Sequence, residues 1–118
     1  MTSKKGKISV VIIHYNTPEY LETCIESVLK QSYENVEIIF IDNDSPDKTG
    51  ITFVKEKYDH LANFKMILNL KNAGYAKAAN QGIRIADDAK YIVITNPDII
   101  YTKDYFKNCV ERIEEDSE

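Results

Sequence analysis

Four short apolar stretches, each followed by a segment with helical periodicity, constrain the fold of this chain more than any other feature. The stretches are rich in β-branched residues, as buried strands typically are, and they span residues 7–13, 36–41, 64–68 and 91–94. Apolar residues recur at helical spacing between and after them, in segments 17–29, 51–58, 75–86 and beyond Thr102 or Asp104. This alternation predicts an α/β fold, a Rossmann-like parallel sheet of about four strands with helices on both faces.

Three residues indicate how the helices begin and pack. Thr17 and Pro18 predict the start of the first helix, because a hydroxyl suits the N-cap and proline suits the first helical position. Gly82 falls in the middle of the third helical segment, where glycine costs about 1 kcal/mol relative to alanine. We therefore expect another element to approach the helix closely at Gly82.

The length of 118 residues and the net charge of −4 narrow the class of protein. A single domain of this size can bury a core, and its two cysteines, Cys24 and Cys109, favour a reducing compartment. The acidic balance argues against broad nucleic-acid binding. No apolar run approaches the ~20 residues that span a bilayer, and the N-terminus lacks the features of a signal peptide. We expect a cytoplasmic protein in which Lys4, Lys5 and Lys7 could contact the inner face of a membrane.

Polar residues directly follow three of the four predicted strands. Parallel sheets bind ligands at the carboxyl ends of their strands, near the point where the strand order reverses. The residues in question are His14, Tyr15 and Asn16; Asp42, Asn43, Asp44 and Ser45; and Thr95, Asn96, Pro97 and Asp98. We expect them to lie along one edge of the sheet, where they would suit a nucleotide.

Asp42 comes directly after an apolar strand, and its position has two interpretations. An ionised carboxylate accepts hydrogen bonds, so Asp42 could bind a ring N–H of a nucleotide base. Aspartate also commonly stabilises turns and caps helices, and this segment alone favours neither role.

The tripeptide Asn96, Pro97 and Asp98 is a candidate for metal-assisted binding of a phosphate. Asp98 is a hard oxygen ligand of the kind that holds Mg²⁺ or Mn²⁺ together with substrate phosphates. An ion held there would neutralise a diphosphate and stabilise its departure. An isolated Asn-Pro-Asp sequence is more typical of a turn with Asp98 in solvent, so the tripeptide by itself is a weak indication.

The third helical segment follows the turn of residues 72–74. Free backbone N–H groups at the start of a helix favour an anion, and this helix carries Lys77, Asn80 and Gln81. Its small residues also fit tight packing of a helix on a sheet, and the two interpretations have equal weight.

Several other kinds of site are excluded or disfavoured. The chain has no G-x-G-x-x-G, no P-loop and no G-x-S-x-G sequence. His14 and His60 are far apart without a cysteine at ligand spacing, so a zinc site is not expected. Cys24 and Cys109 fall on apolar helical stripes and are expected in the core rather than as nucleophiles.

Three segments together resemble the donor half of the family 2 glycosyltransferases, which have the GT-A fold. They are residues 10–50, NAGYAKAANQGI at 72–83 and YIVITNPDI at 91–99, and their order and spacing match the family. Any one of them would be weakly specific, whereas all three in order are strongly so. The N-P-D sequence, in place of D-x-D, is similar to a rhamnosyltransferase-like branch of the family.

The resemblance implies a role for particular residues. Tyr15 and Asn16 would lie beside the nucleotide base, and Asp42 would bind its ring N–H. Asn43 would be a further donor-binding residue. Residues from Asn72 through Gly74 to Asn80 would line the diphosphate-sugar side. Asn96 would lie near the ribose, and Asp98 would hold Mg²⁺ or Mn²⁺, although Asn96 removes a charge that the family usually has there.

The resemblance also implies a reaction, an inverting transfer of a sugar from a uridine or thymidine diphosphosugar to a saccharide or lipid-linked acceptor. Similar proteins continue for another hundred residues or more and carry the acceptor site and general base there. We therefore expect residues 1–118 to form a donor-binding half of a longer domain, with no catalytic base and little transfer by itself. The alternative is a non-catalytic α/β nucleotide-binding or interaction module, and an uncovered apolar face could make either form a homodimer.

Overall fold

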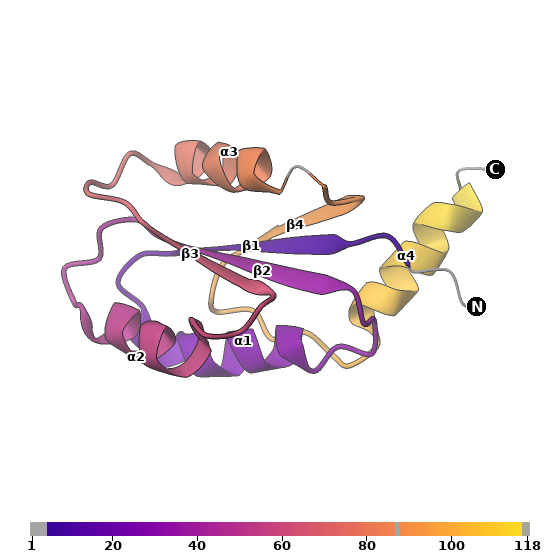
Figure 1. The fold of residues 1–118 in the computed structure, drawn as a ribbon, viewed down its shortest axis with the longest axis horizontal. Coiled ribbons are helices and arrows are strands. Elements are labelled where there is room, and N and C mark those ends of the chain that lie inside the picture. The colour runs from indigo at the N-terminus through magenta and orange to yellow at the C-terminus, as the bar shows by residue number, and fades with distance from the viewer. Residues whose placement is uncertain (1–4, 87, 117–118) are drawn as a thin grey trace.

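Four parallel strands form one sheet in the order β3-β2-β1-β4 (Figure 1). The structure is a computed structural model that describes residues 5–86 and 88–116. Its strands are β1 (Ile8–His14), β2 (Val36–Asp42), β3 (Phe64–Leu68) and β4 (Tyr91–Thr95). Its helices are α1 (Leu21–Leu29), α2 (Thr49–Tyr58), α3 (Tyr75–Ile85) and α4 (Tyr105–Asp116), and a 3₁₀ turn, η1 (Pro18–Tyr20), precedes α1. The strand order reverses at β1, because β2 and β3 lie on one side of it and β4 on the other.

The helices cover both faces of the sheet, as the sequence predicts. Alternate residues of the central strands point to opposite faces. Val10 and Phe40 belong to the core beneath α1 and α2, which Phe106 of α4 also joins. Val11 and Ile39 belong to a smaller core beneath α3. Figure 1 shows α1 and α2 on one side of the sheet and α3 alone on the other.

Two local predictions differ from the structure. The Thr17 hydroxyl makes no capping hydrogen bond, since the chain first forms the tighter turn η1 and the Thr17 amide instead donates to Nε2 of His14 (3.0 Å). Strand β4 is not buried throughout. Ile92 and Ile94 are 39% and 38% exposed, because β4 is an edge strand and α3 lies over β1 and β2.

The close approach expected at Gly82 is confirmed. A Cβ atom placed on Gly82 would lie 2.5 Å from Cγ1 of Val11, in the central strand β1. Ala78 and Ala79 in the same helix are also buried against the sheet. Small residues therefore let α3 lie close to the sheet, and this close packing fixes the position of the helix on the sheet. Within the described ranges, no helix is both long and apolar enough to cross a membrane.

A network of charged side chains lies on the sheet face that carries α3, near the amino ends of the strands. Glu37 is 6% exposed and accepts a hydrogen bond from Ser9 (2.8 Å) while forming ion pairs with Lys65 (2.9 Å) and Lys7 (3.3 Å). Burial acts to raise the pKa of Glu37, but these three partners outweigh it and lower the pKa below its ordinary value. The ionised carboxylate is thus more favourable in the folded chain than in the unfolded one.

This network predicts how stability responds to acid. A carboxyl group with a lowered folded pKa contributes stability above its unfolded pKa, about 4.3 for glutamate, and loses it as the pH falls through the folded pKa. We expect Glu37→Gln to be less stable than the wild type at pH 7 and to lose less stability on acidification. Urea denaturation followed by circular dichroism from pH 7 to pH 3 tests this, with Glu56→Gln on the exposed surface of α2 as the control. An unchanged acid limb in Glu37→Gln would contradict the assignment.

Candidate functional site

A cavity of about 330 Å³ lies at the carboxyl ends of the strands, next to the point where the strand order reverses. Its wall is formed by residues at or after the ends of β1, β2 and β4 and by residues at or just before the start of α3: Ile13, Tyr15, Thr17, Tyr20, Asn43, Asn72, Tyr75, Asn96, Pro97 and Asp98. Among these wall residues, Asp98 is the one with a charged side chain. The position agrees with the expected place for a ligand in a parallel sheet.

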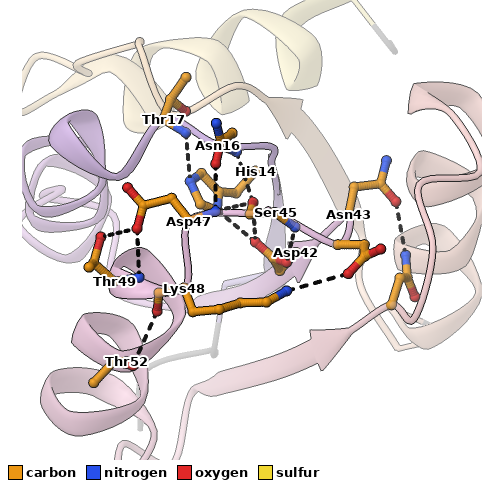
Figure 2. Close-up of polar contacts among 12 residues, drawn as sticks. His14, Asn16, Thr17, Asp42, Asn43, Ser45, Asp47, Lys48, Thr49 and Thr52 are labelled. Carbon is orange, nitrogen blue, oxygen red and sulfur yellow. Dashed lines mark hydrogen bonds and ion pairs between the residues drawn. The ribbon is translucent and has the colours of Figure 1, made fainter.

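Three buried side chains behind this cavity bind one another, as Figure 2 shows. Parallel register sets His14 at the end of β1 beside Asp42 at the end of β2. Nδ1 of His14 lies 2.8 Å from Oδ1 of Asp42, and this oxygen also accepts a hydrogen bond from the Ser45 hydroxyl (2.7 Å). The Ser45 amide donates to Oδ2 of Asp42 (2.9 Å). We call His14, Asp42 and Ser45 the buried triad.

The hydrogen bonds of the triad define the protonation of His14. Because the Thr17 amide donates to Nε2 of His14, that nitrogen is an acceptor, and Nδ1 carries the proton donated to Asp42. Burial acts to raise the pKa of Asp42, but the hydrogen bonds from His14 and Ser45 outweigh it and lower the pKa. The triad therefore holds an ionised carboxylate beneath the cavity.

The geometry changes the expected role of Asp42. Its side chain is 1% exposed, both oxygens already accept hydrogen bonds from the triad, and it is absent from the cavity wall. Because Asp42 is buried and absent from the wall, a base in the cavity would not contact this carboxylate. The neighbouring Asn43 lines the cavity instead. Of the two interpretations of Asp42, the turn-stabilising one matches the structure.

A chain of side-chain amides joins Asn43 to α3. Oδ1 of Asn43 accepts a hydrogen bond from Asn69 (3.1 Å), and its Nδ2 donates to the carbonyl of Gly74 (3.3 Å). Asn69 and Gln81 exchange two hydrogen bonds of 3.0 Å each. These contacts tie the ends of β2 and β3 to the loop that opens α3. They therefore fix the position of that loop beside the cavity.

Two predicted residues hold the backbone rather than face the cavity. Asn16 has a φ of 56°, its amide donates to the Ser45 hydroxyl, and its side chain accepts from the Asp47 amide (Figure 2). Gly74 has a φ of 98°, which glycine adopts without strain, and its amide donates to Oδ1 of Asn72 (2.9 Å). Gly74 thus turns the chain so that α3 begins beside the cavity.

The Asn96 to Asp98 segment lies next to Cys24, which belongs to the core beneath α1 and α2. Sγ of Cys24 in α1 is 3.9 Å from the carbonyl oxygen of Asn96. Burial and, secondarily, the nearby carboxylate of Asp98 raise the pKa of Cys24 to about 11. Cys24 is therefore a protonated core residue, as predicted, and not a nucleophile.

The donors on the cavity wall fit a divalent ion that arrives with a phosphate ligand. In the part of the chain that the structure describes, no three histidine, cysteine, aspartate or glutamate side chains gather as a preformed metal site. One carboxylate, that of Asp98, does line the cavity beside the amide of Asn96. Mg²⁺ commonly binds through one or two carboxylates and completes its shell with waters and substrate phosphates. This donor set matches that mode of binding.

The structure brings most, but not all, of the predicted residues to one site. Tyr15, Asn43, Asn72, Asn96 and Asp98 line the cavity. Asn16 and Gly74 support its wall, Asp42 lies beneath it, and Asn80 is exposed on α3 without lining it. Sequence reasoning did not name two tyrosines of the wall, Tyr20 in η1 and Tyr75 at the start of α3, although Tyr75 falls within the predicted range 72–80. Each lies close in sequence to a recognised polar segment, which is the only signal that could have indicated them.

Comparison with known proteins agrees with this geometry. The family model described as "Glycosyl transferase family 2" matches residues 9–118. GlyG, a glycosyltransferase of Streptococcus pneumoniae, is 36% identical over 109 residues, which are 92% of this chain and 35% of GlyG. The minor teichoic acid biosynthesis protein GgaB of Bacillus subtilis is 32% identical over 91% of this chain and 12% of GgaB. The chain thus spans about a third or less of these relatives.

Solved structures share the fold. The crystal structure of S. aureus TarS 1-349 in complex with UDP-GlcNAc has a TM-score of 0.81 and 27% identity, covering 92% of this chain and 31% of that one. The mannosyltransferase PcManGT of Pyrobaculum calidifontis has a TM-score of 0.80 at 24% identity, covering 91% of this chain and 32% of that one. The four-stranded layer is therefore an arrangement that occurs within larger chains.

Proposed function

The chain belongs to glycosyl transferase family 2, and from this membership we propose that residues 1–118 form the donor-binding half of a glycosyltransferase. The donor is a nucleoside diphosphate sugar with uridine or thymidine as its nucleoside. The acceptor is a saccharide or a lipid-linked saccharide. The observation that carries the proposal is the meeting of Tyr15, Asn43, Asn96 and Asp98 around one cavity at the strand-order reversal.

Each wall of the cavity suits one part of such a donor. Tyr15 is 47% exposed and offers a ring on which a base can stack. Asn43 offers an amide to the edge of the base and replaces Asp42 in that role. Asn96 is assigned to the ribose. The loop of Asn72, with the free amides at the start of α3, favours the diphosphate.

The proposed reaction is an inverting displacement at the anomeric carbon. An acceptor hydroxyl oxygen forms the new bond, the bond from the anomeric carbon to the diphosphate oxygen breaks, and the nucleoside diphosphate leaves. The hydroxyl proton passes to a general base outside residues 1–118. Asp104, the first carboxylate after Asp98, is exposed just before α4 and absent from the cavity wall. A divalent ion, Mg²⁺ or Mn²⁺, would supply charge neutralisation for the departing diphosphate. Asp98 would hold that ion.

Calorimetry of the chain with nucleoside diphosphates tests this proposal. UDP or TDP is titrated with Mn²⁺, with Mg²⁺ and with a chelator, and GDP serves as the comparison. We expect binding of a pyrimidine diphosphate that requires the metal. A folded chain that binds no nucleoside diphosphate under any of these conditions would instead favour the non-catalytic module, and light scattering would then test whether it forms a homodimer.

Asp98→Ala is expected to weaken metal-dependent binding of the nucleotide by roughly tenfold to a hundredfold. Removing a charged partner from such a contact costs about 1.5–3 kcal/mol, and each 1.4 kcal/mol is a factor of ten. Asp98 is exposed, so its loss should leave the melting temperature nearly unchanged. Glu56→Ala removes an exposed carboxylate far from the cavity wall and is the matched control. Equal affinities of the two variants would refute the assignment of Asp98.

A further inference from the structure

A segment in the second half of this acidic chain contains basic residues and no acidic ones. Residues 69–86 contain Lys71, Lys77 and Arg84 and no acidic residue. The net charge of the whole chain is −4, so the remaining residues carry −4 − 3 = −7. All three cations are exposed. Within residues 5–86 and 88–116, none of the three forms an ion pair.

The three cations surround a hollow distinct from the donor cavity. Its volume is about 430 Å³, and Asn69, Leu70, Lys71, Ala73, Lys77, Ala78, Gln81 and Arg84 line it. Among the residues that the structure describes, no acidic side chain is in that lining. The hollow lies on the loop before α3 and on α3 itself, the helix that stands alone on its face of the sheet (Figure 1). We call Leu70, Lys71, Lys77 and Arg84 the basic face.

An apolar side chain projects from the rim of this hollow. Leu70 is 95% exposed, more than any other large apolar side chain that the structure describes. Ile83 in α3 is 40% exposed. Cations interspersed with exposed leucine or isoleucine are typical of surfaces that lie in the headgroup region of a bilayer.

The cationic residues expected near a membrane from the sequence are less suited to it. Lys7 forms ion pairs with Glu37 and Asp88, so its charge is already matched within the fold. The ammonium of Lys5 lies 5.9 Å from the centre of the Tyr33 ring. Lys4 lies outside the residues that the structure describes. The basic face differs from Lys5 and Lys7 in that its cations line one hollow with no acidic side chain among the described residues of that lining.

We propose that the basic face docks on a bilayer surface rich in anionic lipid headgroups, with Leu70 entering the acyl boundary. Lys77 and Arg84 are seven residues apart, so they lie on one side of α3 and about 10 Å apart along its axis. That spacing suits neighbouring headgroups rather than a single phosphate ion. Neither a free phosphate nor a nucleic acid gives Leu70 a place out of water. The inference is independent of the proposed function, although it would bring a lipid-linked acceptor near the cavity.

Sedimentation with vesicles tests the proposal. Vesicles of phosphatidylcholine with and without phosphatidylglycerol are compared at low and high salt. We expect binding that requires phosphatidylglycerol and weakens at high salt. Each cation near such a surface contributes about a factor of five, so neutralising all three should weaken binding roughly a hundredfold. The variant for this is Lys71→Gln, Lys77→Gln and Arg84→Gln combined.

The control neutralises as many exposed lysines elsewhere, with Lys55→Gln, Lys103→Gln and Lys107→Gln combined, and should bind nearly as the wild type does. Leu70→Ser should weaken vesicle binding about tenfold at either salt concentration, because it removes the apolar contact alone. Equal losses in the two triple variants would overturn the proposal, as would absence of vesicle binding. Displacement of the vesicles by inorganic diphosphate, or by a single-stranded oligonucleotide, would also overturn it and identify the other ligand.

Discussion

Asp42→Ala is expected to destabilise the chain by about 3–5 kcal/mol. The substitution removes the carboxylate that accepts from three buried donors, Nδ1–H of His14 and the amide and hydroxyl of Ser45. The Ser45 hydroxyl oxygen, 3.4 Å from Nδ1 of His14, is a longer contact that replaces only part of the lost bonding. Each unsatisfied buried donor costs about 1–3 kcal/mol, and a domain has only about 5–15 kcal/mol in total. Urea denaturation followed by circular dichroism measures the loss, and the variant should be partly unfolded at 37 °C.

Asp44→Asn is the matched control for this experiment. Asp44 lies two residues further on and has a φ of 64°, which asparagine tolerates better than alanine does. Its side chain is 43% exposed, and its carboxylate pairs with Lys48 at the surface. Exposed pairs of this kind contribute little, so the control should unfold close to the wild type. If Asp42→Ala and Asp44→Asn were equally stable, the buried triad would not be the structural anchor described above.

Gly82→Ala is expected to destabilise the chain by up to about 2 kcal/mol, although alanine favours helices. The new methyl group would lie 2.5 Å and 2.8 Å from the two Cγ atoms of Val11, so either the helix or the central strand must move. Overpacking of this kind costs about 1–3 kcal/mol, whereas the gain in helix propensity is about 1 kcal/mol. Thermal and urea denaturation measure the difference.

The double variant Gly82→Ala with Val11→Ala separates overpacking from other causes. Val11→Ala alone creates a cavity beneath α3, and the methyl group that Gly82→Ala introduces would partly fill it. We expect the double variant to lose at least about 1 kcal/mol less than the sum of the two single losses. Additive losses would show that contact with Val11 is not the reason for glycine at this position.

The sequence was sufficient to predict the fold because each strand and helix carries its own local signal. The predicted strand 64–68 coincides with β3, and the strands predicted at 36–41 and 91–94 each end one residue before β2 and β4 do. The strand predicted at 7–13 begins and ends one residue before β1. What the sequence could not give was the partial exposure of β4. An edge strand and a central strand have the same apolar composition, and only the position of α3 distinguishes them.

The candidate site was predictable at the level of segments and less so at the level of atoms. Strand ends indicated which loops would meet, and Tyr15, Asn96 and Asp98 do line one cavity. Neighbours in sequence, however, divide between cavity and core. Asp42 and Asn43 follow the same strand, and only the position of His14 across the sheet directs the carboxylate inward.

The cavity combines a side chain that is already held in place with tyrosine side chains that are exposed, and this difference affects how ligand affinity arises. Asn43 is held by Asn69 and Gly74 before any ligand arrives, so little rotational freedom remains to be lost there. Tyr15, Tyr20 and Tyr75 are between 46% and 49% exposed and must be immobilised by a guest. The entropic cost of binding is thus concentrated at the three exposed tyrosines, whereas discrimination between ligands depends on the preorganised Asn43.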